Sequence, residues 1–221
     1  MKNQVSPKKS VFEQLTRVAK GFAHPARIEL LEALGQGERH VEELAKVCGL
    51  PIANTSHHLQ VLREGGLVRS RKAGLQVFYS LSDEEVPLVA AAMGRIGERH
   101  VAEVERLVRE HFASKDDLQP VGRKELLKML KSGEATVIDV RPSSEYHAGH
   151  IRGAINVPME SFSEYLSTLP KEQEVIAYCR GPYCMLSFDA VEQLRRRGYR
   201  ARRLEDGFPE WKSSHLPVEE G

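Results

Sequence analysis

Two cysteines lie five positions apart in one short segment, Cys179-Arg180-Gly181-Pro182-Tyr183-Cys184. An apolar run at 174–178 precedes this segment and predicts a buried strand, and a helical stretch follows it. A Gly/Pro loop between a strand and a helix offers unpaired backbone N–H groups and the positive end of a helix dipole, which favour an anion. Both lower the pKa of a thiol in the loop. The placement therefore favours a reactive thiolate at Cys179 over an inert structural cysteine.

Alternating strands and helices are expected to position this loop. Short β-branched runs predict strands at 136–140, 154–157 and 174–178. Helical segments are predicted at 124–131 and 162–169. Alternation at this length indicates a small α/β domain with a mainly parallel sheet.

Several separated motifs, in order, resemble a single rhodanese domain over about residues 118–221. They are Asp139-Val140-Arg141-Pro142, Glu145-Tyr146, Gly149-His150-Ile151-Arg152-Gly153-Ala154-Ile155-Asn156-Val157-Pro158, Tyr178-Cys179-Arg180-Gly181 and Gly207-Phe208-Pro209-Glu210-Trp211.

The rhodanese resemblance implies a sulfur-transfer site. In that family the loop cysteine takes a sulfane sulfur from thiosulfate, a polysulfide or a persulfide and passes it to a thiol or cyanide. Cys179 would be the nucleophile, and Arg180 would attract anionic donors. Asp139 and Arg141 would order the neighbouring loops. The persulfide would lie against the backbone N–H groups of Arg180, Gly181, Tyr183 and Cys184, since Pro182 has none.

Cys184 stands where rhodanese loops more often carry Arg, Lys or Thr, and two interpretations are open. Attack of Cys184 on a Cys179 persulfide would form an intraloop disulfide or polysulfide bridge and reshape the loop. Alternatively, Cys184 packs at the start of the next helix. A phosphatase or arsenate reductase with a Cys-x5-Arg loop is not indicated, because Met185 stands six positions after Cys179.

The first half of the chain combines helices with a hairpin. Apolar periodicity and Gly/Pro interruptions predict helices at about 15–22, 24–34, 41–47 and 52–64. Two strands are predicted at 67–71 and 76–81, around a turn that contains Gly74. A short helix, a tight turn, a polar helix and a basic hairpin predict a winged helix-turn-helix.

Two segments of this half resemble the ArsR/SmtB family of bacterial transcriptional repressors, over about residues 10–112. They are His24-Pro25-Ala26-Arg27-Ile28-Glu29-Leu30-Leu31 and Ser56-His57-His58-Leu59-Gln60-Val61-Leu62-Arg63-Glu64-Gly65-Gly66-Leu67-Val68. Family members are usually homodimers that insert the second helix of the motif into the major groove of DNA and lay the wing along the backbone. The sequence departs from the family at Pro51-Ile52-Ala53, where polar residues are more usual.

The ArsR/SmtB resemblance implies a set of DNA contacts. The side chains facing bases or nearby phosphates would be Asn54, Ser56, His57 and Gln60, and those contacting phosphates would be Arg63, Arg69, Arg71 and Lys72. One of His57 and His58 is alternatively a capping or packing residue. Residues 65–81 contain no acidic residue, as expected of a phosphate-binding surface, although a solvated basic turn has the same composition.

Many family members bind metals, and this chain has two incomplete candidate sites. Cys48 supplies one sulfur where a soft-metal site needs a Cys-x-Cys pair, so we expect it to be a small buried hydrophobe. On the last helix, predicted over 83–112, Glu98, His100 and His111 match ligand positions, but the final carboxylate position is Ser114. No metal or other cofactor is therefore expected. The alternative role of this helix is dimerisation, through an apolar stripe of Val89, Met93, Ile96, Val104, Leu107 and Val108.

Length and composition bound these expectations. A chain of 221 residues exceeds the common domain size of about 100–150 residues, so two domains are expected. The polar segment 114–120 separates the two patterns. We therefore place a DNA-binding and dimerisation domain at 1–114 and a rhodanese-like domain at 115–221. Residues 1–115 contain 17 basic and 14 acidic residues, and residues 116–221 contain 15 basic and 17 acidic residues. The net charge of +1 is thus the sum of a mildly basic and a mildly acidic half, and it does not exclude binding of nucleic acid.

Three cysteines are too few for a disulfide framework, and no apolar run reaches the roughly 18 residues of a membrane span. The N-terminus has no apolar signal-peptide core. These features indicate a protein of a reducing cytoplasm.

Together the two halves predict a homodimeric transcription factor, by resemblance a repressor, that binds double-stranded operator DNA and responds to reactive sulfur or redox state through Cys179. One alternative is a sulfurtransferase that moves sulfur from thiosulfate or a persulfide to a thiol or cyanide and carries an accessory DNA-binding domain. The other is a metal-responsive repressor with a sulfur-handling appendage. Multiple turnover dependent on Cys179 would indicate the first, and zinc binding lost in His100→Ala or His111→Ala the second.

Overall fold

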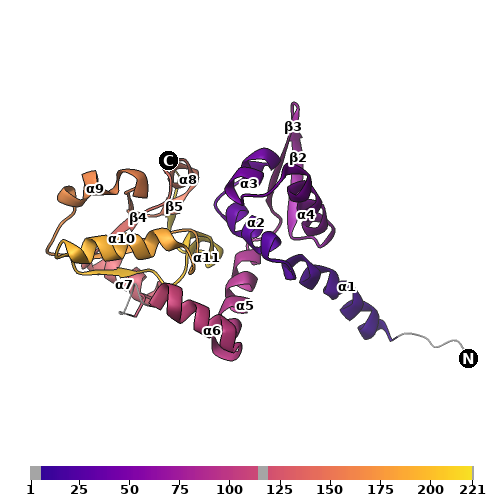
Figure 1. Cartoon of the computed structure of the whole chain (residues 1–221), viewed down its shortest axis with the longest axis horizontal. Coiled ribbons are helices and arrows are strands. Elements are labelled where there is room, and N and C mark those ends of the chain that lie inside the picture. The colour runs from indigo at the N-terminus through magenta and orange to yellow at the C-terminus, as the bar shows by residue number, and fades with distance from the viewer. Residues whose placement is uncertain (1–5, 114–118, 221) are drawn as a thin grey trace, which may run out of the picture. The chain divides into compact units, whose positions relative to one another are not determined.

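The structure is a computed structural model that describes residues 6–113 and 119–220 (Figure 1). The chain divides into two compact units, residues 1–86 and 87–221, each with its own core. No helix of the described residues combines the length and the apolar character needed to cross a membrane.

The first unit, as far as residues 6–86 describe it, contains four helices and a small antiparallel sheet. The helices are α1 (Pro7–Phe22), α2 (Pro25–Gly35), α3 (Val41–Val47) and α4 (Ile52–Glu64). The strands are β1 (Arg39–His40), β2 (Val68–Ala73) and β3 (Gln76–Leu81), in the order β1-β3-β2. The predicted winged helix-turn-helix is confirmed.

Apolar packing and two positive-φ glycines shape this unit. Leu30, Leu44 and Leu59 are fully buried where α2, α3 and α4 meet. Gly49 has a φ of +63° just after α3, a conformation that favours glycine and turns the chain towards α4. Gly74 has a φ of +62° in the two-residue turn of the β2–β3 hairpin, which projects beyond the helices of its unit (Figure 1).

The second unit begins with helices and continues as an α/β fold. Its helical segments are α5 (Val86–His100), α6 (Ala102–Val108), the π-helical turn η1 (Arg109–Ala113), α7 (Arg123–Ser132), α8 (Ser143–Ala148), η2 (Met159–Ser161), α9 (Phe162–Tyr165), η3 (Leu166–Thr168), α10 (Met185–Arg196) and α11 (Phe208–Ser213). Its strands are β4 (Ala135–Asp139), β5 (His150–Ile151), β6 (Ile155–Asn156), β7 (Glu174–Tyr178), β8 (Ala201–Arg203) and β9 (Val218–Glu219). Strands β6-β4-β7-β8 form a parallel sheet, as expected, and β5 pairs antiparallel with β9.

Alternating side chains give this sheet two apolar faces. Val175 and Ala177 of β7 join one core cluster, which includes buried residues of α9 and α10. Ile176 and Tyr178 of the same strand join a second cluster with residues of α7 and α11. Because successive strand residues point to opposite faces, one strand contributes to both layers of helices.

Two features differ from the sequence-based expectations. The single helix predicted over 83–112 is interrupted at Val101, which is extended with φ −115° and ψ 101°, so His100 and His111 do not share one continuous helix. After the interruption the Val104 side chain lies next to Gly97 of α5. The expectation that Cys48 is buried is also wrong, because it is half-buried at the C-terminal end of α3.

Candidate functional site

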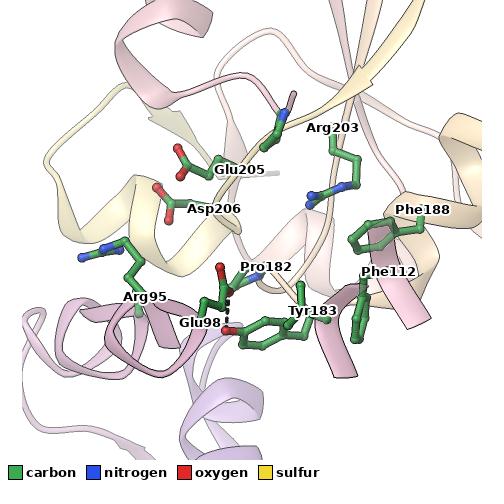
Figure 2. A pocket seen from close by; sticks show the side chains of 12 residues that line it. Arg95, Glu98, Phe112, Pro182, Tyr183, Phe188, Arg203, Glu205 and Asp206 are labelled. Carbon is green, nitrogen blue, oxygen red and sulfur yellow. Dashed lines mark hydrogen bonds between the residues drawn. The ribbon is translucent and has the colours of Figure 1, made fainter. Parts of the chain in front are cut away.

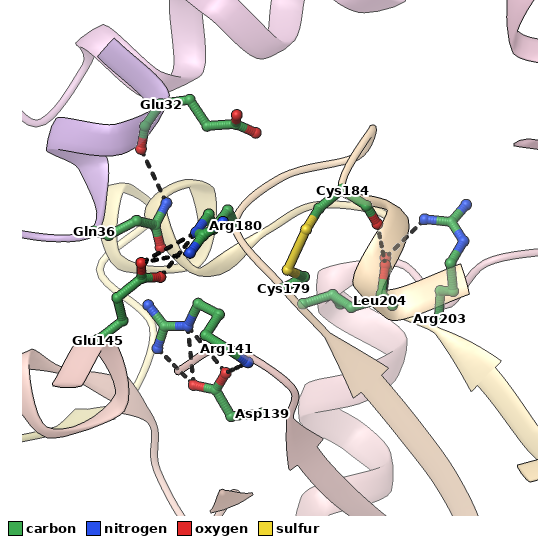
Figure 3. The surroundings of a disulfide bond; sticks show 11 residues. Glu32, Gln36, Asp139, Arg141, Glu145, Cys179, Arg180, Cys184, Arg203 and Leu204 are labelled. Atoms are coloured by element: carbon green, nitrogen blue, oxygen red, sulfur yellow. Dashed lines mark hydrogen bonds and ion pairs between the residues drawn. A yellow bond between two sulfur atoms is a disulfide. The ribbon is translucent and has the colours of Figure 1, made fainter. Parts of the chain in front are cut away.

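The two cysteines of the loop between β7 and α10 are joined by a disulfide (Figure 3). Cys179 directly follows β7 and is 1% exposed, whereas Cys184 caps the start of α10 and is half-buried. Their Cα atoms are 6.2 Å apart, within the usual range of about 4.4–6.8 Å for a disulfide. The loop therefore accommodates a bond between these two sulfurs. We call residues 179–184 the thiol loop.

The backbone of the thiol loop packs against Gly207 and Phe208, at the start of α11. A Cβ on Gly207 would lie 2.3 Å from the Arg180 carbonyl oxygen and 2.5 Å from the Gly181 nitrogen, so this contact requires glycine. The Phe208 N–H donates to the Cys179 carbonyl at 3.0 Å. The Cys184 N–H donates to the Gly181 carbonyl at 3.2 Å, so it is used within the loop rather than directed at a ligand.

Arg180 is bound by Glu145 of α8. The guanidinium donates to both carboxylate oxygens over 2.7–3.1 Å, and Glu145 is 4% exposed (Figure 3). The carboxylate neutralises the cation that was expected to attract anionic sulfur donors. Sequence reasoning quoted Glu145 as part of a motif without assigning this partnership.

Asp139 and Arg141 form an ion pair near the thiol loop, and both side chains are fully buried (Figure 3). Arg141 donates to the Asp139 carboxylate at 2.5–3.1 Å and to the Gly149 carbonyl at 2.8 Å. The Tyr178 hydroxyl donates to Asp139 at 2.6 Å. Burial, followed by the charge of Asp139, raises the pKa of the Tyr178 phenol well above its ordinary value, so the phenol remains a protonated donor. The network links the ends of β4 and β7 to the loop after α8.

Tyr183 connects the thiol loop to α5. Its hydroxyl donates to a Glu98 carboxylate oxygen at 2.6 Å (Figure 2). Burial and this hydrogen bond raise the pKa of the Tyr183 phenol. The ring borders a cavity of about 230 Å³ whose lining includes Arg95 and Phe112. The rhodanese resemblance implies a place for Tyr183 in the persulfide cradle, and Glu98 was a candidate ligand of an incomplete metal site; the sequence did not relate the two.

The residues predicted to contact DNA lie on one helix and one strand of the first unit. Asn54, Ser56 and His57 are exposed on α4. Gln60 is exposed one turn further along, where it binds Glu64 at 2.8 Å and accepts from Arg63 at 2.9 Å.

His58 is half-buried, whereas His57 is exposed. The ring of His58 lies 4.5 Å from that of His24. Burial, followed by the nearby His24 and Arg27, lowers the pKa of His58, which favours its neutral form. This is the division of roles that sequence reasoning left open for the two histidines.

The basic side chains of the wing differ in their partners. Arg69 donates to the Ser80 hydroxyl at 3.0 Å, and Arg63 lies 3.5 Å from the Ser70 hydroxyl. Arg71 forms an ion pair with Glu38 and stacks over the Phe78 ring at 4.8 Å. Lys72 is exposed near the hairpin turn. The partner of Arg71 was not foreseen, because Glu38 is 33 residues away in sequence.

The residues considered for a metal do not form a cluster in the part of the chain that is described. No group of three or more His, Cys, Asp or Glu side chains there could hold an ion. Glu98 is engaged by Tyr183, and Ser114 lies outside the described residues.

Comparison with known proteins agrees with both halves of the fold. Residues 22–71 match a family model described as a helix-turn-helix domain, and residues 122–214 match the rhodanese-like domain. Such a pair of domains defines a transcriptional regulator with a rhodanese-like module. The chain belongs to the ArsR-type helix-turn-helix regulators that carry a C-terminal rhodanese-like domain, so both resemblances are confirmed.

Three relatives illustrate the match. The HTH-type transcriptional regulator Rv0324 of Mycobacterium tuberculosis is 38% identical over all of this chain and 97% of its own length. A transcriptional repressor SmtB homolog of Synechocystis is 36% identical over 38% of this chain and 65% of its own length. The solution structure of the homodimeric winged helix-turn-helix domain of Mb0332 from Mycobacterium bovis is 33% identical, covers 47% of this chain and 95% of that one, and has a TM-score of 0.41.

Proposed function

We propose that this regulator binds operator DNA through α4 and the β2–β3 hairpin, and that bond formation between Cys179 and Cys184 sets its DNA affinity. The disulfide in the thiol loop carries the proposal. A sulfur-transfer loop needs one nucleophilic cysteine, whereas this loop has two, at a separation that allows them to bond.

The proposed chemistry has two balanced steps. The Cys179 thiol first takes the outer sulfur of a small persulfide, giving a Cys179 persulfide and releasing the donor as a thiol. The Cys184 thiol then attacks the Cys179 sulfur. Its proton leaves with the outer sulfur as hydrosulfide, and the Cys179–Cys184 disulfide forms. The two protein thiols lose two electrons, and the sulfane sulfur gains them.

Operator binding is proposed for the exposed polar face of α4 and the basic wing. Asn54, Ser56, His57 and Gln60 provide donors and acceptors that suit base edges or phosphates, and Arg63, Arg69, Arg71 and Lys72 provide positive charge. Glu38 lowers the net charge available at Arg71. Lys72, exposed near the hairpin turn, is therefore the sharper test of phosphate contact.

Lys72→Ala is expected to weaken operator and non-operator DNA alike and to reduce the slope of log K against log salt by about 1, the loss of one phosphate contact. Fluorescence anisotropy over a salt series measures the slope. Lys128→Ala, which removes an exposed lysine of α7, is the matched control and should leave the slope unchanged. If Lys72→Ala has the same salt dependence as the wild type, Lys72 does not contact a DNA phosphate.

A homodimer is proposed because apolar side chains are exposed on helices of both units. Val11, Phe12 and Leu15 of α1 are 54–56% exposed, and Met93 and Ile96 of α5 are 41% and 53% exposed. Apolar stripes of this kind are typical of contact surfaces. Sedimentation equilibrium should give twice the chain mass of 24.9 kDa, and the mass of one chain would contradict the proposal.

The reduced wild-type protein tests the main proposal when it is treated with polysulfide. Intact mass is expected to show the loss of two hydrogens, the product of bridging, after a transient gain of one sulfur. Operator affinity, measured by mobility shift on the same samples, should change by at least about fivefold, the lower end of ordinary coupling between sites. Unchanged affinity in a protein shown to be bridged would reject the proposal.

A sulfurtransferase remains the second candidate, because the matched rhodanese-like domain includes Cys179 and its loop. The sulfurtransferase and the proposed switch differ in the number of reactions that each chain completes. A sulfurtransferase converts many equivalents of thiosulfate or persulfide in the presence of cyanide or a thiol, whereas the proposed switch stops after one bridge per chain.

A further inference from the structure

Tyr183 lies between the two cysteines of the thiol loop, and its side chain extends to α5. Its backbone directly precedes Cys184, whose sulfur is bonded to Cys179. Its hydroxyl donates at 2.6 Å to Glu98 in the C-terminal part of α5 (Figure 2). Because the acceptor is a carboxylate, this hydrogen bond is stronger than one between neutral groups.

Gly94 leaves the space that Tyr183 occupies. A Cβ at position 94 would lie 2.9 Å from the Tyr183 hydroxyl oxygen and 3.6 Å from its ring. Glycine is a poor helix former compared with alanine. Its place within α5 is therefore explained by the approach of Tyr183 rather than by the helix itself.

Aromatic contacts extend from Tyr183 to other elements of the unit. The Tyr183 ring lies 5.8 Å from that of Phe112 in η1, and Phe112 lies 5.2 Å from Phe188 in α10. Arg203 stacks over the Phe188 ring at 3.9 Å. A shift of Tyr183 therefore changes contacts with both α5 and η1.

We infer that Tyr183 is the positioning residue through which the bond between Cys179 and Cys184 controls helix α5. This inference rests on the proposed function, in which the bond sets DNA affinity. The bond holds the two cysteine Cα atoms 6.2 Å apart, and so fixes the position of Tyr183 relative to the end of β7. Breaking it removes this restraint and lowers the population of the Tyr183–Glu98 hydrogen bond. The first residue of α5, Val86, follows strand β3 of the wing by only a short connection.

Coupling between two equilibria is reciprocal, which provides a test that does not involve DNA. If the bond favours the Tyr183–Glu98 contact, the contact favours the bond. A small dithiol reduces the bond by supplying two electrons and two protons, and becomes a cyclic disulfide. The ratio of reduced to oxidised dithiothreitol at half-reduction then measures the stability of the bond.

Gly94→Ala is the main variant, because the added methyl group displaces the Tyr183 hydroxyl while alanine favours the helix. It should lower the dithiol ratio needed for half-reduction by about fivefold or more, measured by alkylation and intact mass. Gly97→Ala on the same helix is the control, since its Cβ would make ordinary contacts of 3.5–3.9 Å with Val104. The control should match the wild type. Glu98→Gln and Tyr183→Phe should shift the ratio in the same direction as Gly94→Ala.

The outcomes separate this inference from the proposed function. A wild-type reduction ratio in Gly94→Ala, Glu98→Gln and Tyr183→Phe overturns the role of Tyr183, even where bridging still alters DNA affinity. If the DNA affinity of the wild-type protein is the same with and without the Cys179–Cys184 bond, the proposed function is overturned, whatever the dithiothreitol ratios of the variants are. When both hold, the ratio of the DNA affinities of bridged and reduced protein approaches one in Gly94→Ala and stays at the wild-type value in Gly97→Ala.

Discussion

Asp139→Asn is expected to lower the free energy of unfolding of the rhodanese-like domain by about 3–5 kcal/mol. Asparagine keeps the shape of the side chain but removes the negative charge that faces the fully buried Arg141 guanidinium. The Tyr178 hydroxyl also loses its carboxylate acceptor. A buried charge deprived of its counter-charge has a large desolvation cost that the remaining hydrogen bonds offset only in part.

Denaturant unfolding followed by Trp211 fluorescence measures this loss. Trp211 is the one tryptophan of the chain and is fully buried in the same domain, so its signal reports this unit. Glu192→Gln is the control, because it removes a carboxylate that pairs with the exposed Arg196 on the surface of α10. Such surface pairs contribute about 0–1 kcal/mol. Equal losses in the two variants would show that the buried pair does not stabilise the domain.

Cys179→Ser is expected to abolish the response of the regulator to polysulfide. The serine hydroxyl cannot accept a sulfane sulfur, so neither a persulfide nor a bridge forms at this position. Intact mass and operator affinity should then be the same before and after treatment. A Cys179→Ser protein that responds as the wild type does would contradict the assignment of the sensing thiol.

Cys184→Ser separates the two steps at the thiol loop. This variant should gain one sulfur at Cys179 but cannot lose two hydrogens, and its operator affinity should stay unchanged because no bridge forms. A full affinity response in this variant would make the persulfide itself the signal. Cys48→Ser is the matched control. Cys48 is half-buried in the first unit, outside the thiol loop, and its loss should leave the whole response intact.

Local signals in the sequence were sufficient for the elements of both units and for the place of the thiol loop. Proline at the start of α2, the Gly/Pro turn after α3 and the β-branched strand β7 act over a few residues, so they are visible in the chain itself. The interruption at Val101 was missed because the apolar periodicity continues across it. The extended backbone of Val101 is a local departure that the apolar spacing does not contain.

The partners of the charged side chains could not be predicted in the same way. Glu38 with Arg71, Glu145 with Arg180 and Glu98 with Tyr183 are each separated by 33 to 85 residues. Such pairs depend on how the elements pack, and the types of the residues alone allow many partners. The sequence therefore named most of the residues around the thiol loop but not the contacts that determine what each of them does.

The two ends of the thiol loop are held very differently, and this gives its movement a direction. Gly207 lies against the backbone of Arg180 and Gly181, and Glu145 holds the Arg180 side chain. At the other end Tyr183 is held through its side chain and is 38% exposed. The first half of the loop is thus restrained through both its backbone and a side chain, and the second half through the Tyr183 side chain. If the Cys179–Cys184 bond controls Tyr183 as inferred, the movement on breaking it is therefore expected at Tyr183 and Cys184 rather than at Arg180 and Gly181.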